Sequence, residues 1–153
     1  MNSIQPAAWS GPEPAVPGDM HHQDIAMQTF NKVTLYTGPD GCARFREEPI
    51  RLESDNPQVL LSERLPVSAM QLRNSPVGFR SKQHVTASPQ WVFILSGIME
   101  ITLLDGTSRR FHVGDHFYSA DTLPAGQEFD AATHGHRSRQ VGDSPLVTLF
   151  IRD

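Results

Sequence analysis

The hydrophobic residues of this chain fall in short runs that turn residues separate. Alternation with a period of two is clearest at residues 99–104, which predicts a half-buried β-strand. Asp105-Gly106 follows directly and supplies the positive φ that a tight hairpin requires, so residues 107–112 should form the returning strand. In the first strand the side chains expected to face inward are Met99, Ile101 and Leu103, and those expected outward are Glu100 and Thr102.

The same pattern predicts strands over most of the remaining chain and no helix of three turns. Proline at Leu65-Pro66 and at Ser75-Pro76 marks strand ends, because proline cannot donate to a β-ladder. Many short strands at close spacing are typical of a sandwich or barrel, so we predict an all-β fold. The strands expected are residues 33–36, 59–65, 69–73, 77–80, 91–96, 99–104, 108–112, 116–120, 135–140 and 147–152.

Two segments do not fit the strand pattern. Residues 1–26 contain Pro6, Pro12, Pro14 and Pro17, and we expect a flexible, proline-rich extension that precedes a domain of residues 27–153. Residues 121–134 have the composition of a loop and are longer than most connections. This second segment is either a lid or binding loop, or a plain surface excursion.

Composition narrows the class of protein. With 153 residues, 38% hydrophobic and 20% charged, the chain fits one globular domain. A net charge of −4 and the lack of a long basic run argue against nucleic acid as a partner. No apolar run approaches the ~20 residues of a membrane helix. The single cysteine, Cys42, excludes an internal disulfide, and without a secretory signal pattern we expect a cytoplasmic protein.

The segment Gly78–Gly97 carries the most specific spacing in the chain. Five residues separate Gly78 from His84, one separates His84 from Thr86, three separate Thr86 from Gln90, and six separate Gln90 from Gly97. This spacing resembles the first motif of the cupin family, G-x5-H-x-H-x3,4-E-x6-G. Thr86 stands at the second histidine and Gln90 at the glutamate, so the metal motif is degenerate. The resemblance is to small, single-domain, RmlC-like cupins, and it covers about half of the chain.

The second cupin motif, G-x5-P-x-G-x2-H-x3-N, fits the sequence in two registers. One uses Pro124-Ala-Gly126 and puts Phe129 at the histidine position. The other uses His136 through Gln140, with residues 121–134 as an insertion, and we favour it because it supplies an imidazole. The resemblance then implies a cupin-type double-stranded β-helix, a jelly-roll barrel, with the extended N-terminal tail in front of it.

The resemblance also implies where a ligand would bind. It carries His84, Gln90 and His136 over as ligands of one divalent metal ion, such as Fe, Ni, Zn or Mn, although the set lacks a carboxylate. His84 and His136 could instead be paired histidines that hold no metal. Further candidates for the pocket are Arg80, Thr86, Trp91, Phe117, His134 and Gln140.

Three functions stay open at this stage. A small organic molecule could bind in the barrel of an enzyme of lyase, isomerase or oxygenase type, which would use a metal or histidine acid–base chemistry. The chain could instead be a non-catalytic small-ligand binder or sensor, or a scaffold whose proline-rich tail binds a partner. The resemblance to small cupins also implies a homodimer, in which pairing covers an exposed strand edge, with the strand of residues 33–36 as a candidate contributor.

Overall fold

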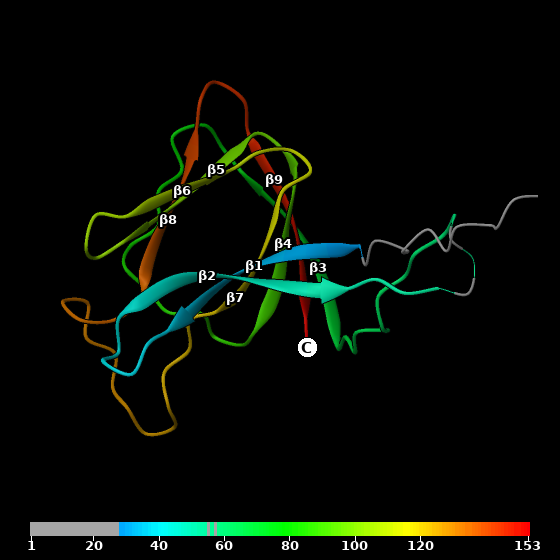
Figure 1. Ribbon diagram of the computed structural model, residues 1–153. Coiled ribbons are helices and arrows are strands. Elements are labelled where there is room, and N and C mark those ends of the chain that lie inside the picture. Colours follow the sequence, from blue (N-terminus) through cyan, green and yellow to red (C-terminus); the bar gives the residue numbers. More distant parts are fainter. Residues whose placement is uncertain (1–27, 55, 57) are drawn as a thin grey trace, which may run out of the picture.

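The protein is described by a computed structural model that covers residues 28–54, 56 and 58–153. Every regular element in this part of the chain is a β-strand, as the sequence predicts (Figure 1). The predicted extension of residues 1–26 lies outside the described residues. The strands are β1 (Thr29–Thr37), β2 (Ala43–Arg51), β3 (Ala69–Ser75), β4 (Gln90–Ser96), β5 (Ile98–Leu103), β6 (Ser108–Phe111), β7 (His116–Ala120), β8 (His136–Val141) and β9 (Leu146–Arg152).

The strands form two sheets that face each other. The larger has the order β2-β1-β7-β4-β9-β3, and the smaller has the order β6-β5-β8 (Figure 1). Among the strand pairs described in the larger sheet, β1 and β7 run parallel and all the others run antiparallel. Through this parallel pair, the β1–β2 hairpin joins the edge of the sheet beside β7. Consecutive strands repeatedly change sheet, which is the jelly-roll connection. The fold is therefore an all-β jelly roll, a double-stranded β-helix.

The core lies between the sheets, where alternate residues of each strand meet. Met99, Ile101 and Leu103 are buried, which confirms the predicted inward face of β5. Burial of this apolar surface is the main favourable term in folding. The largest hydrophobic side chains of the core come from strands of both sheets: Leu35, Val92, Ile94, Ile101, Phe111, Phe117 and Leu146.

Glu100 departs from the simple alternation. It lies on the outer face of β5, as predicted, yet it is only 6% exposed. Arg110 of β6 and Arg139 of β8 bind its carboxylate from the two neighbouring strands, at 2.8 and 2.6 Å. This charge pairing holds the pKa of Glu100 below its usual value, with the Arg110 hydrogen bond as the largest cause.

The hairpin predicted from Asp105-Gly106 is confirmed. Gly106 has a φ of 86°, and its N–H donates to the carbonyl of Leu103 at 3.1 Å. Thr102 of β5 pairs with Ser108 of β6, so the two strands are paired directly on either side of the predicted turn. The Asp105-Gly106 turn, which adopts the positive φ that a tight hairpin requires, explains why the hairpin forms at this position.

The strand prediction was wrong in three places. Residues 59–65 and 77–80 are not strands, and they make only isolated bridges. Gly78, at a φ of 84°, breaks the second of these segments. Conversely, β2 was not predicted, because Glu47, Glu48 and Pro49 weaken the strand pattern. An edge strand tolerates these residues, since one of its sides needs no hydrogen-bonded partner.

The segment from Asp121 to Gly135 contains no strand, which confirms the predicted loop. Its C-terminal part folds back on Asp130, whose carbonyl accepts a hydrogen bond from the N–H of His134 at 2.8 Å. Among the described residues, no helix is long and apolar enough to cross a membrane.

Candidate functional site

A cavity of about 360 Å³ lies between the two sheets. Strands β3, β4, β7 and β9 line it from the larger sheet, and β5 and β8 line it from the smaller. This size falls in the range of roughly 300–1,000 Å³ that is usual for small-molecule sites. The cavity brings together five residues that the sequence nominated, namely His84, Thr86, Gln90, Phe117 and His136.

Strand register explains why Gln90 points into this cavity. It begins β4, where Val92 and Ile94 continue the inward row at alternate positions. Its neighbours in register are Ser119 of β7 and Arg152 of β9. The side-chain oxygen Oε1 of Gln90 is buried and accepts no hydrogen bond from any residue in the described part of the chain. A buried polar atom without a partner is costly, so this oxygen marks a place for a ligand donor.

His84 and His136 form the centre of the site. Their backbones exchange two hydrogen bonds of 3.0 and 2.9 Å, although they lie on segments far apart in sequence. Their rings lie 4.5 Å apart between centroids, with an angle of 52° between the planes. Two imidazoles therefore face the same small volume.

Both rings are held by an acceptor at Nδ1. The carbonyl oxygen of Lys82 lies 2.9 Å from Nδ1 of His84, and Oδ2 of Asp121 lies 2.8 Å from Nδ1 of His136. Because a carbonyl or carboxylate oxygen can only accept, Nδ1 carries the proton in both rings. A ring that carries its one proton at Nδ1 keeps a lone pair at Nε2, where it can accept a proton or bind a cation.

Asp121 was not nominated from the sequence, although it proves central. It is 0% exposed, and its Oδ1 accepts a 2.7 Å hydrogen bond from the Thr37 hydroxyl while Oδ2 faces His136. Its carbonyl also accepts the N–H of Thr86 at 2.8 Å. In sequence it begins the long loop, and only its place directly after the strand of residues 116–120 could have drawn attention to it.

Burial keeps His84 uncharged. Loss of hydration on burial is the largest cause that lowers the pKa of His84 below its ordinary value of 6.5, and the nearby His136 ring lowers it further. The Lys82 carbonyl acts in the opposite direction. His84 is therefore a neutral imidazole near pH 7, which suits it to accept a proton.

The other nominated residues lie elsewhere. Arg80 lines a separate polar groove on the outer side of the smaller sheet, together with Arg137 and Arg139. Gln140 is buried, and its amide donates to the carbonyls of the turn that joins β8 to β9, at 2.8–3.0 Å. His134 bonds within the loop, to Gln127 and to the Asp130 N–H, each at 3.0 Å.

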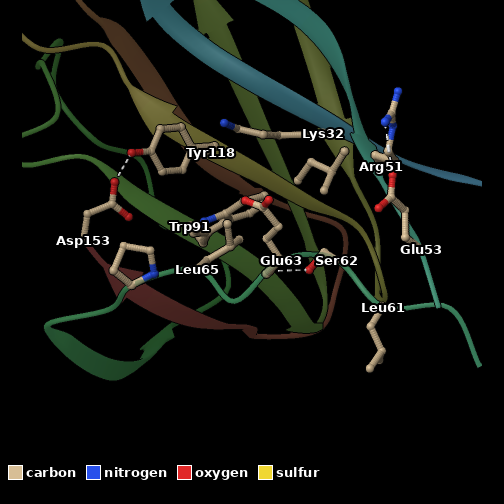
Figure 2. A pocket seen from close by; sticks show the side chains of 12 residues that line it. Lys32, Arg51, Glu53, Leu61, Ser62, Glu63, Leu65, Trp91, Tyr118 and Asp153 are labelled. Carbon is tan, nitrogen blue, oxygen red and sulfur yellow. Dashed lines mark hydrogen bonds and ion pairs between the residues drawn. The ribbon is translucent and has the colours of Figure 1, made fainter. Parts of the chain in front are cut away.

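Trp91 faces away from the cavity, because it sits one residue after the inward Gln90. On the outer face of the larger sheet it packs beside Tyr118, Lys32 and Leu65 (Figure 2). This outer hollow of about 760 Å³ is the larger of the two. No histidine lies among its described lining residues, so we place the chemistry in the smaller cavity.

The donor atoms fit a divalent cation only in part. Two Nε2 lone pairs and the free Gln90 oxygen have suitable atom types, and Asp121 positions His136 as carboxylates do behind metal-bound histidines. The carboxylate of Asp121 is nevertheless occupied at both oxygens. Within residues 28–54, 56 and 58–153, no group of three His, Cys, Asp or Glu side chains could hold a metal ion. Any metal would rest on three neutral ligands.

No protein-family model and no curated protein matches this chain. Six chains of solved structures do, and one of them is the cupin domain of Cnp3 from Schizosaccharomyces pombe. That match has 16% identity and a TM-score of 0.40, and it covers 82% of this chain and 88% of the other. The fold assignment therefore rests on strand order and register, and the function rests on the site itself.

Proposed function

We propose that the chain binds a small organic molecule in the cavity between its sheets and transfers a proton to or from that molecule. The observation that carries the proposal is the pair His84 and His136, two imidazoles held by Nδ1 acceptors beside one cavity of about 360 Å³. Polar groups that converge in one pocket are the usual sign of a binding site.

The proton transfer follows from the hydrogen bonds. Nε2 of His136 accepts a proton from the bound molecule, while its Nδ1–H remains bonded to the Asp121 carboxylate. That carboxylate stabilises the imidazolium and keeps the ring in one orientation. The imidazolium formed at His136 then returns this proton to a second position of the same molecule, beside the neutral ring of His84. Reaction of this kind would place the protein among isomerases or lyases.

Affinity selection tests the binding step. The full chain is incubated with a mixture of small metabolites, and retained compounds are identified by mass spectrometry. We expect enrichment of a compound by the wild type and by His112→Ala, and loss of that compound with His136→Ala. His112 is an exposed histidine outside the cavity, so it is the matched control. Equal retention by the wild type and His136→Ala would contradict the proposal.

Turnover separates the enzyme from the alternative, a non-catalytic sensor. The compound selected by the wild type is incubated with the protein in deuterated water, and deuterium incorporation at carbon is followed by NMR. Incorporation that depends on His136 indicates proton transfer. Tight binding without incorporation or product favours the sensor.

A metal-assisted reaction is the second candidate, and the two free Nε2 atoms favour it. The metal would be held by His84, His136 and Oε1 of Gln90, and it would supply Lewis-acid activation of a bound oxygen. Elemental analysis of the purified wild type and of His84→Ala tests this. A stoichiometric metal lost in the variant supports the assignment, and a metal kept by the variant excludes it.

We also propose a homodimer formed through β3 and the outer face beside it. β3 ends the larger sheet, so one side of its backbone is open. Met70 and Leu72 on this strand are 70% and 64% exposed, and Leu61, Leu65 and Val67 lie exposed near the same outer face. Open edges and contiguous apolar surface are features that pairing with a second chain removes.

A further inference from the structure

We infer that the molecule bound in the cavity is a small organic acid that carries a hydroxyl group close to its carboxylate. This inference deepens the proposed function and rests on it. The argument depends on charge and on unpaired polar atoms along one row of the larger sheet.

The cavity has cationic groups and no anionic ones. Arg73 and Arg152 line it, and its described lining contains no aspartate or glutamate. Neither arginine forms an ion pair with a carboxylate of the described chain: Arg73 stacks over Phe79 at 4.6 Å, and Arg152 donates to the neutral Gln71 at 3.1 Å. Arg73 is exposed at the edge of the cavity, whereas Arg152 is half-buried. A half-buried guanidinium without a carboxylate partner fits an anion with two oxygens, which it can bind with two parallel hydrogen bonds.

The pairing of β9 with β4 fixes how far the charged group of Arg152 lies from the polar side chain of Gln90. Arg152 of β9 lies directly opposite Gln90 of β4, and Gln90 lies opposite Ser119 of β7. Residues in such cross-strand pairs have Cβ atoms only about 5 Å apart. A carboxylate at Arg152 therefore places the next few atoms of the same molecule beside the Gln90 amide.

Gln90 needs a hydrogen-bond donor. Its Oε1 is buried and unpartnered in the described chain, whereas Ser119 already shares a 2.6 Å hydrogen bond with Thr86. A ligand hydroxyl near the carboxylate can donate to this oxygen. A carboxylate oxygen cannot, because it only accepts. The ligand thus needs both groups.

The next inward row limits the rest of the ligand. It consists of Phe150, Val92 and Phe117, which follow one another in register across β9, β4 and β7. These side chains offer apolar contacts and no hydrogen bonds. A short carbon skeleton suits a cavity wall made of these apolar side chains.

Matched small acids test the inference. Lactate and malate are titrated into the full-length protein at neutral pH, with lactamide and malamide lacking the charge, and propanoate and succinate lacking the hydroxyl. Binding is followed by NMR chemical shifts. A hydrogen bond to a charged group is worth about tenfold in affinity or more, so we expect a hydroxy acid to bind at least roughly tenfold tighter than both of its analogues.

Variants locate the binding. Arg152→Met should weaken the hydroxy acid by roughly tenfold or more, and Arg152→Lys by less, because it keeps the charge. Gln90→Leu should abolish the preference for the hydroxy acid over its deoxy analogue. Arg137→Met is the matched control, since Arg137 lines the outer groove of the smaller sheet instead. It should change nothing.

Three results would overturn the inference: equal binding of acid and amide, equal loss with Arg137→Met and Arg152→Met, or no binding by any hydroxy acid of the panel. The comparison of ligands on wild-type protein does not depend on how the variants fold. The affinity selection could instead retain a neutral compound that the His136→Ala variant loses, while no hydroxy acid of the panel binds. In that case the proposed function stands and only the ligand class is wrong.

Discussion

His84 and His136 pair as neighbours in a β-bridge, each donating its backbone N–H to the carbonyl of the other, and their rings lie 4.5 Å apart. The bridge attaches the irregular segment before β4 to the first residue of β8. Two imidazoles consequently enter the cavity from positions that backbone hydrogen bonds fix. A site positioned in this way needs little rearrangement when its ligand arrives.

Gly135 permits this pairing, and its replacement should break it. Gly135 has a φ of 83°, and a Cβ at this position would overlap the carbonyl oxygen of His84. We expect Gly135→Ala to lower the free energy of unfolding by roughly 3 kcal/mol or more. Gly142→Ala is the control, because Gly142 has a similar φ of 86° and open space around its Cβ.

The control should cost only the backbone strain, about 1–2 kcal/mol. Chemical denaturation of both variants measures the difference. If both variants lose the same free energy of unfolding, the close approach of Gly135 to His84 does not contribute to stability.

Removal of the Asp121 carboxylate should disturb His136. Asp121→Ala leaves the buried Nδ1–H of His136 without its acceptor, at a cost of roughly 3 kcal/mol in unfolding free energy. The hydroxyl of Thr37 loses one acceptor and keeps the carbonyl of Thr122 at 2.9 Å. Asp121→Asn keeps one acceptor oxygen and should cost less. Long-range ¹H–¹⁵N NMR spectra of the ring report the tautomer directly. We expect protonated Nδ1 in the wild type and a mixture of tautomers in Asp121→Ala; an unchanged tautomer would contradict this role.

Tyr118 should make the protein sensitive to alkali. Burial, followed by the hydrogen bond that its hydroxyl donates to Asp153, raises the pKa of Tyr118 from 10.0 to about 12. A raised folded-state pKa means that the folded protein favours the neutral phenol. The resulting stability is fully present below pH 10 and is lost as the pH rises from 10 towards 12.

Spectrophotometric titration of phenolate absorbance in the wild type and in Tyr118→Phe isolates this group. The difference between the two curves should have its midpoint near 12, the raised value of Tyr118. Asp153→Asn should lower that midpoint, since the charged partner is gone. A midpoint near 10.0, the ordinary value, would contradict the environment described.

The oligomeric state should respond to charge on β3. Met70→Lys combined with Leu72→Glu places charges where two apolar side chains are 70% and 64% exposed. We expect light scattering to give the mass of two chains for the wild type and of one for the variant. The matched control is Val113→Lys, an equally exposed apolar residue at 64% in the turn before β7. A wild type with the mass of one chain would end the dimer proposal.

The hairpin of β5 and β6 and the loop after β7 could be predicted because their causes are local. Asp105-Gly106 fixes one turn, and alternation fixes the inward face of β5. The face that Trp91 presents could not be predicted, because its strand is apolar at nearly every position and so carries no alternation. That face was decided by the neighbours that β4 acquires in the folded sheet.

By itself, the sequence determined an all-β chain, its principal turns and the spacing that carries His84, Gln90 and His136. Tertiary structure alone decided that these three line one cavity while Arg80, Trp91, His134 and Gln140 do not. It also added Asp121, whose partners Thr37 and His136 lie 84 and 15 residues away in the chain. Side-chain type and spacing are local properties, whereas burial and hydrogen-bond partnership depend on which distant strands become neighbours.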